Sequence, residues 1–242
     1  MSYNGFFWLH IKKSAGTTVK KALTPEYVVV DHKHFPKTFI QADKEEYNDI
    51  LNNYRVVLGE YKFKRALFAK KYLYKEEWEK IYSFAFSREP VERCVSMFHY
   101  LYWGNPGFFH DLERTLRMSL RYKKLFSVEY AFDAFLEDVE AAHNTDSIYR
   151  PKNLHFTTHV ARMWDDITDE NGKILLKKVY RVDEIENSLN EVYESIGSKK
   201  RVRIDKVYNK GKMDRKYTPK PHQIKKIEAL YKEDFDLFES SK

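Results

Sequence analysis

The first apolar segment of the chain runs directly into a stretch of small, hydroxyl-bearing and basic residues. Small residues let backbone N–H groups approach an anion closely, and a helix start offers unpaired N–H groups and the positive end of its dipole. This composition predicts a loop that cradles a phosphate-like anion, in which Lys13 adds a mobile positive charge. The loop residues with this expected role are Lys12, Lys13, Ser14, Ala15, Gly16, Thr17 and Thr18.

The order of residues in this loop differs from that of nucleotide triphosphatases. Their pattern places a glycine four residues before a Gly-Lys-Ser/Thr unit, whereas here the lysine precedes the loop's only glycine, Gly16. The alternative interpretation is an ordinary strand-to-helix turn in which Ser14 or Thr17 caps the helix. A second motif later in the chain favours the anion site.

This second motif follows another apolar run, at residues 81–86. Arg88 comes at the carboxyl end of the expected strand, and Pro90 suits the first turn of a helix. Arg93, Ser96 and Tyr100 then recur at helical spacing on one face of that helix. Two phosphate-binding motifs on one sheet predict a ligand that is phosphorylated at both ends.

Both motifs resemble those of the sulfotransferases that use 3′-phosphoadenosine 5′-phosphosulfate (PAPS), especially the carbohydrate type related to heparan sulfate 2-O-sulfotransferase. Residues 10–18 are similar to that family's 5′-phosphosulfate loop, commonly His-Ile-Pro-Lys-Thr-Gly-Gly-Thr-Ser. Residues 86–96 are similar to its 3′-phosphate motif, a strand ending in Arg-(Asp/Glu)-Pro with a serine eight positions after the arginine. Lys12 departs from the pattern by replacing the proline, and Ala15 replaces the first glycine of the pair.

The resemblance implies PAPS as the cofactor and a role for each matched residue. Lys13 is expected to stabilise the charge that grows on the leaving phosphate, and the rest of the loop to hold the 5′ group. Arg88 and Ser96 are expected to hold the 3′-phosphate, whereas Arg93 is expected to serve helix packing or a surface ion pair.

A basic run near the carboxyl terminus includes Lys212 and Arg215. In the family an equivalent loop closes over the adenosine 3′-phosphate, so the resemblance implies that role for both residues. The alternative for this run is a solvated basic surface.

The general base has three candidates. Glu60 stands where carbohydrate sulfotransferases often have a histidine, and the heparan N-deacetylase/N-sulfotransferases use a glutamate base; its alternative role is an ion pair with Lys62 or Arg65. His32 and His34 follow an expected strand and compete for the same role. Their His-x-His spacing lacks a convincing third ligand, so we expect no metal site.

Further histidines and aromatic residues bear on the acceptor. His155 and His159 have helical spacing in a region similar to the family's acceptor side, where structural and acceptor-binding roles remain open. Aromatic side chains that either stack on sugar rings or pack in the core are Tyr100, Tyr102, Trp103 and Trp164.

Alternating strands and helices must position these residues. Strands are predicted at residues 6–11, 27–31, 55–60, 81–87 and 177–182, and helices at 17–23, 43–53, 64–72, 90–103, 111–121, 131–142, 184–196 and 220–238. This order predicts an α/β fold with a P-loop-like, mainly parallel central sheet and helices on both faces. The resemblance covers nearly the whole chain, so we expect one sulfotransferase domain at residues 1–242.

Composition agrees with an enzyme that binds anions. The formal net charge is +7, and no apolar run approaches the roughly 20 residues that cross a bilayer. The single cysteine, Cys94, excludes an internal disulfide, and we expect a cytoplasmic location.

The expected function is sulfuryl transfer from PAPS to a carbohydrate or other hydroxyl-bearing acceptor, without nucleic acid as a partner. Two alternatives stay open at this point. A P-loop kinase would use ATP with Mg²⁺ on a similar loop, and a non-catalytic module would bind nucleic acid or another polyanion through the basic surface.

Overall fold

A parallel sheet forms the centre of the computed structural model, which describes residues 6–23, 64–103, 127–144, 154–204 and 217–241. Strands β1 (Phe6–Leu9), β2 (Tyr82–Ser87) and β3 (Lys178–Arg181) pair in the order β1-β2-β3, and both pairings are parallel. This confirms three of the predicted strands. The other two, at 27–31 and 55–60, and the predicted helices at 43–53 and 111–121 lie outside the described residues.

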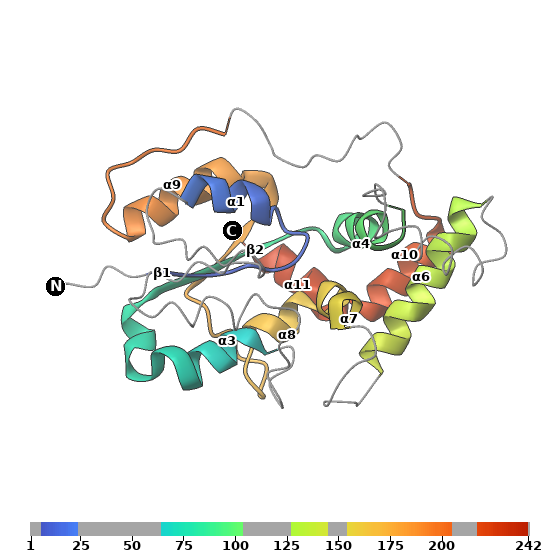
Figure 1. The fold of residues 1–242 in the computed structure, drawn as a ribbon, viewed down its shortest axis with the longest axis horizontal. Coiled ribbons are helices and arrows are strands. Elements are labelled where there is room, and N and C mark those ends of the chain that lie inside the picture. Colours follow the sequence, from blue (N-terminus) through green and yellow to red (C-terminus); the bar gives the residue numbers. More distant parts are fainter. Residues whose placement is uncertain (1–5, 24–63, 104–126, 145–153, 205–216, 242) are drawn as a thin grey trace.

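Both faces of the sheet are buried by helices. Side chains alternate between the two faces of a strand, so β1 sends Phe7 to one apolar cluster and Trp8 to another. Helices α1 (Gly16–Leu23) and α9 (Ile185–Ser195) cover the Trp8 face, and Figure 1 shows them together above the sheet. On the Phe7 face lie the short helices α3 (Arg65–Phe68) and α8 (Met163–Ile167). The predicted α/β architecture is therefore confirmed.

A third apolar cluster lies beyond the carboxyl ends of β1 and β2 (Figure 1). Its helices are α4 (Pro90–Phe98), α6 (Val128–His143), α7 (Leu154–Val160) and α10 (Pro221–Leu230). Because α4 continues directly from β2, this helical group meets the sheet at the strand ends where ligands bind in open α/β folds.

Two predicted helices change their hydrogen-bonding pattern along their length. The helix expected at 64–72 is α-helical only at α3; it continues as a π-helical segment, Ala69–Tyr74, and a 3-10 helix, Lys75–Lys80. The helix expected at 90–103 comprises α4 and a π-helical segment, His99–Trp103.

The single helix predicted at 220–238 is wrong. The structure has two helices, α10 and α11 (Lys232–Ser240), with a break at Tyr231, whose backbone angles are φ −126° and ψ 30°. The buried Tyr231 hydroxyl donates a hydrogen bond to the Val160 carbonyl, 2.8 Å away, so tertiary contacts hold the chain at this break. Neither α7 nor α8 is among the predicted helices.

Hydropathy along the described helices bears on membrane insertion. Within these ranges of the chain, each helix is too short or too polar to reach across a bilayer.

Candidate active site

The loop after β1 has an unusual backbone conformation. Lys13 and Ala15 both have positive φ, 66° and 53°, in the left-handed region that non-glycine residues rarely adopt. Within the described ranges, no other residue accepts a hydrogen bond from the N–H groups of Lys12, Lys13, Ala15 or Gly16. Consecutive amides around left-handed residues form the concave nests that bind anions. The sequence prediction of a loop with available backbone donors therefore agrees with the geometry.

Gly16, the first residue of α1, is required by its contact with His10. A Cβ atom at this position would lie 1.8 Å from Nε2 of His10. The His10 ring stacks on Trp8 with 5.1 Å between ring centroids, which leaves it little room to move aside. Burial, followed by the charges of Lys12 and Arg65, lowers the pKa of His10 well below its usual value, so this ring is neutral.

Three arginines from different elements hold the carbonyl groups of the loop. Arg65 of α3 donates to the His10 carbonyl at 3.1 Å, and Arg93 of α4 donates to the Lys12 carbonyl at 3.2 Å. Arg88, between β2 and α4, donates to the Lys13 carbonyl at 3.2 Å. Charged donors of this kind fix the orientation of each peptide group, so the loop is braced by residues 55 to 81 positions away in sequence.

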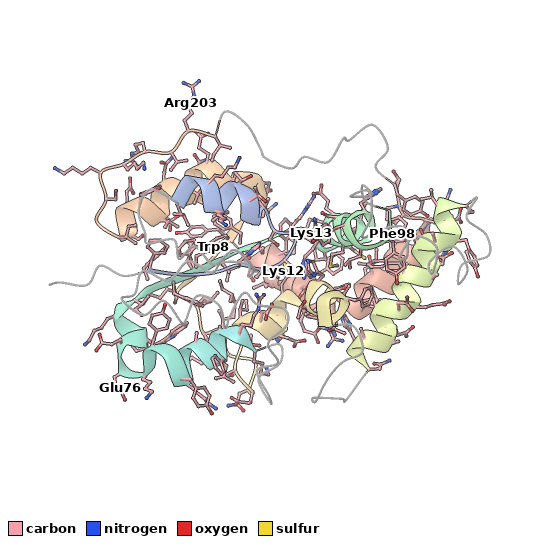
Figure 2. The ribbon with its side chains drawn as sticks, in the orientation of Figure 1. Trp8, Lys12, Lys13, Glu76, Phe98 and Arg203 are labelled. Carbon is pink, nitrogen blue, oxygen red and sulfur yellow. The ribbon has the colours of Figure 1, made fainter. Side chains whose placement is uncertain are left out.

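Figure 2 shows Lys12 and Lys13 in the loop between the sheet and α4. The Lys13 ammonium lies 4.3 Å from the ring centroid of Tyr100, in cation–π contact. Burial, and then the charge of Arg88, lowers the pKa of Lys13 to about 8. Lys13 is thus a partly desolvated cation beside the loop, as expected for a group that meets an anion.

The charges of Arg65 and Asp166 both act on the pKa of Lys12. Burial and the charge of Arg65 lower the pKa of Lys12 to about 7, and the carboxylate of Asp166 opposes this shift. Arg65 and Asp166 are buried and joined by a hydrogen bond of 2.7 Å from Nε to Oδ1. The family's proline is replaced here by a lysine whose charge depends on pH near neutrality.

The hydroxyl residues of the loop differ in exposure. Ser14 and Thr18 are buried, whereas Thr17 is exposed. The Ser14 hydroxyl donates to the Met163 sulfur of α8 at 4.0 Å, so it also links the loop to the helices on the Phe7 face.

The second predicted motif is built on the start of α4. Glu89 caps this helix by accepting hydrogen bonds from the N–H groups of Val91 and Glu92, and Pro90 occupies its first turn. Arg88 is held just before the cap, where its side chain also pairs with the exposed Glu92 at 3.3 Å. Ser96 is half-buried further along the same helix.

Arg93 serves helix packing, but the expected surface ion pair is wrong. Its side chain is only 2% exposed and pairs at 3.3 Å with Asp234, which is completely buried. It also donates to the Ala161 carbonyl at 2.8 Å. Arg93 is buried because it satisfies several carbonyl groups at the junction of the loop, α7 and α11.

The predicted acceptor-side aromatic residues fall into two groups. Tyr100 is 47% exposed, and its ring stacks on that of the buried His159 with 5.0 Å between centroids. Tyr102 and Trp164 are partly buried and pack against the third apolar cluster and the cluster on the Phe7 face, respectively. Among the described side chains of this group, Tyr100 lies beside Lys13 and partly faces solvent, whereas the Trp103 side chain is outside the described part of the structure.

Five predicted site residues lie outside the described residues. These are the candidate bases Glu60, His32 and His34, and the basic residues Lys212 and Arg215. Their proposed roles stay predictions.

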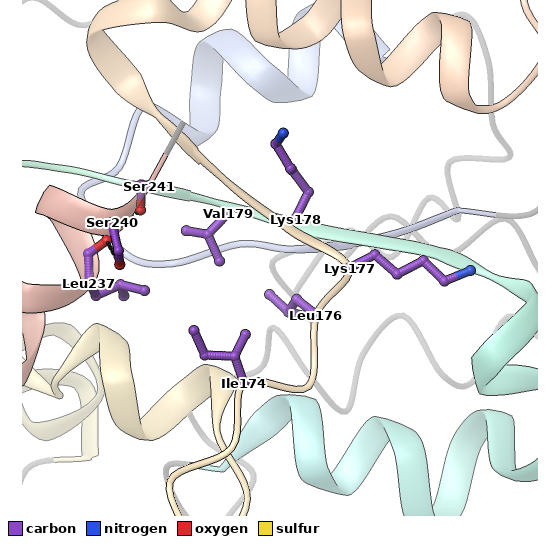
Figure 3. A pocket seen from close by; sticks show the side chains of 8 residues that line it. All are labelled: Ile174, Leu176, Lys177, Lys178, Val179, Leu237, Ser240 and Ser241. Carbon is purple, nitrogen blue, oxygen red and sulfur yellow. Dashed lines mark hydrogen bonds between the residues drawn. The ribbon is translucent and has the colours of Figure 1, made fainter.

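A separate pocket lies along β3 and the end of α11 (Figure 3). It has no lining residue in common with the loop or with the start of α4, so we do not assign it to the candidate site. Its lining residues are Ile174, Leu176, Lys177, Lys178, Val179, Leu237, Ser240 and Ser241.

Sequence reasoning missed the residues that brace the loop. Arg65 is the second residue of one predicted helix and Asp234 lies inside another, so neither has a local motif that distinguishes it. Asp166 belongs to α8, which the sequence does not predict. The sequence offers one signal, which concerns Asp234 alone. This acidic residue shares the buried face of α11 with Leu237 and Phe238, and a carboxylate on an apolar helix face indicates a buried partner.

Comparison with known proteins tests the resemblance independently of this geometry. A family model described as the sulfotransferase family matches residues 2–240. Neither a curated protein nor a solved structure matched the chain. Since the family match extends over nearly all of the sequence and includes both motifs, the chain belongs to the sulfotransferase family, whose members transfer a sulfuryl group.

Proposed function

We propose that this protein transfers a sulfuryl group from PAPS to a hydroxyl or amine group of a carbohydrate. The observation that carries the proposal is the hydrogen bond from Arg88 to the Lys13 carbonyl, which joins the two anion-binding motifs. A nucleotide with phosphate groups at its 5′ and 3′ positions needs two such motifs within one molecule's length.

The residues of the loop suit a doubly charged group. Four backbone N–H groups without a partner among the described residues, together with the Lys13 ammonium, supply donors and positive charge. Bound PAPS would supply the activated sulfuryl group and a phosphate leaving group. We infer that Lys13 and the loop amides hold the 5′ end, with Arg88 and Ser96 at the 3′ end.

Lys13 has the properties of the group that stabilises charge on the leaving oxygen. Preorganised donors of this kind act strongly in a desolvated site, because they need no reorganisation as charge develops. Its present contact with the exposed Tyr100 ring is weak enough to exchange for an anion, since exposed cation–π contacts contribute about 0.5–1 kcal/mol.

The base is proposed from the family resemblance. Glu60 is our first candidate and would accept the proton of the acceptor group, with His32 or His34 as the competing base. If Glu60 is the base, Glu60→Gln lowers turnover by about 10²–10⁴-fold and leaves affinity for the nucleotide product unchanged. Normal turnover in Glu60→Gln combined with loss in His34→Ala would transfer the role to His34.

A sulfate-transfer assay tests the proposed function directly. Radiolabelled PAPS is incubated with glycan, lipid and small-phenol acceptors, and transfer to the glycans is expected. The Lys13→Ala variant should lower turnover by about 10²–10³-fold. Transfer to phenols or lipids alone would overturn the carbohydrate assignment.

Titration with nucleotides separates this function from its alternatives. We expect binding of 3′-phosphoadenosine 5′-phosphate (PAP), the product of PAPS, in preference to ATP with Mg²⁺. Preference for ATP with Mg²⁺ would favour a kinase, and salt-dependent RNA binding without affinity for PAP would favour a polyanion-binding module. Membership of the sulfotransferase family favours neither alternative.

A further inference from the structure

We propose that Asp234, near the carboxyl terminus, is a positioning residue for the loop at residues 12–16, acting through Arg93 and through the first turn of α8. This inference rests on the proposed function, because its consequence is the geometry with which the loop binds PAP or PAPS. Asp234 itself lies on α11 and forms hydrogen bonds with Arg93, Met163 and Trp164, which lie outside the loop.

Asp234 makes contacts to two separate elements. Its carboxylate accepts hydrogen bonds from the N–H groups of Met163 and Trp164, at 3.0 and 2.9 Å, at the start of α8. It also accepts from Nη1 of Arg93 at 3.3 Å. The side chain is completely buried, so these contacts are not shared with solvent.

The first route to the loop passes through Arg93. The guanidinium is planar, so fixing Nη1 on Asp234 and Nη2 on the Ala161 carbonyl also fixes the direction of Nε. Nε donates to the Lys12 carbonyl at 3.2 Å. This bond sets the orientation of the peptide group between Lys12 and Lys13, which contributes an N–H group to the proposed anion nest.

The second route passes through Met163. Its backbone N–H is held by Asp234, and its sulfur accepts the Ser14 hydroxyl at 4.0 Å. Both routes therefore converge on the same loop, one on the Lys12 carbonyl and the other on the Ser14 side chain two positions further along.

Stability alone does not explain a buried charge at this position. Burial raises the pKa of Asp234 to about 6 against the opposing effect of Arg93 and of the two backbone N–H groups. Desolvation of this kind makes buried ion pairs no more stabilising than well-packed apolar residues of similar size. An apolar pair, however, would leave the Lys12 carbonyl without its donor, so the pair is suited to orienting the loop.

Binding and exchange measurements on matched variants test this inference. Asp234→Asn removes the charge, and Arg93→Lys keeps a charge but loses the planar fork. The control is Leu136→Ala, which leaves a cavity in the third apolar cluster and lowers stability without touching the loop. PAP affinity is measured by calorimetry, and amide hydrogen exchange is followed by mass spectrometry in peptides that contain residues 12–16.

Both charge variants should weaken PAP binding by about tenfold or more, as supporting residues behind a binding site typically do. They should also speed exchange of the loop amides in the protein without ligand. Leu136→Ala should lower the melting temperature and keep both wild-type affinity and wild-type exchange of the loop. Met163→Leu, which conserves volume, should speed exchange at Ser14 through loss of the second route.

Each outcome decides between a positioning role and a purely structural one. Wild-type PAP affinity and loop exchange in a folded Asp234→Asn or Arg93→Lys protein would overturn the inference. If both charge variants fail to fold, unchanged loop exchange in Met163→Leu overturns it. If the wild-type protein does not bind PAP, the proposed function fails, whereas loop exchange still tests the positioning role.

Discussion

The guanidinium of Arg88 donates a hydrogen bond to the backbone carbonyl of Lys13 across 3.2 Å. These residues are 75 positions apart in sequence, and each follows one of two neighbouring parallel strands. The two motifs therefore form one continuous surface at the carboxyl end of the sheet. Arg88 contributes to both motifs: it donates a hydrogen bond to the loop of the first motif, and it is the positively charged residue of the second.

Arg88→Ala is expected to weaken PAP binding by about 10–100-fold, because hydrogen bonds to charged groups contribute about 1.5–3 kcal/mol. Calorimetric titration with PAP measures the change. Arg201→Ala is the matched control, since it removes an equal charge from an exposed residue paired with Glu194. Equal losses of affinity in the two variants would show that only the net charge matters.

PAP binding should take up protons near pH 8. The pKa of Lys13 is lowered to about 8, so this lysine is charged below that pH and increasingly neutral above it. A bound phosphate favours the charged form and raises the pKa, so affinity should fall as pH rises through 8.

Proton uptake is measured by calorimetry in buffers of different ionisation enthalpy. Lys13→Arg keeps its charge at these pH values and should lose this part of the uptake. The pKa of Lys12 is lowered to about 7, so any proton uptake by Lys12 occurs at lower pH than that by Lys13. The control variant Lys12→Met removes the Lys12 contribution and should keep the proton uptake near pH 8. Binding by the wild-type protein without proton uptake would contradict the expected role of Lys13.

Gly16→Ala should disrupt the loop, because the added Cβ would occupy the position of the His10 ring. We expect a lower melting temperature and weaker PAP binding. The double variant His10→Ala/Gly16→Ala removes the ring and should recover part of the lost stability. Failure of the double variant to improve on Gly16→Ala would show that the contact with His10 is not the cause.

Ala15→Gly should stabilise the protein by up to about 1 kcal/mol. The left-handed conformation costs a non-glycine residue about 1–2 kcal/mol, which glycine avoids, whereas the greater backbone entropy that glycine loses on folding offsets about 0.5–1 kcal/mol of this gain. The reason is the φ of 53° at Ala15. Chemical denaturation measures the difference. Ala141→Gly in α6 is the control and should destabilise, because its backbone is helical. Destabilisation by both substitutions would contradict the strain at Ala15.

Local sequence patterns determined the elements that carry the site. Two apolar runs, one followed by a loop of small, hydroxyl-bearing and basic residues and the other by Arg88-Glu89-Pro90, predict the ends of β1 and β2, because strand burial and helix capping depend on neighbouring residues. The same patterns did not predict the break at Tyr231 or the helix α8. Both depend on contacts with distant parts of the chain, such as the bond from Tyr231 to Val160.

The sequence by itself determined the residue types of the candidate site and the family to which they belong. Only the tertiary structure decided which residues support them: Arg65 pairs with Asp166 across 101 positions, and Arg93 with Asp234 across 141. The physical reason is that a buried ion pair forms where packing brings two elements together, and no local spacing encodes that meeting. The residue types of the loop are therefore readable in the sequence, whereas the orientation of its peptide groups depends on the fold.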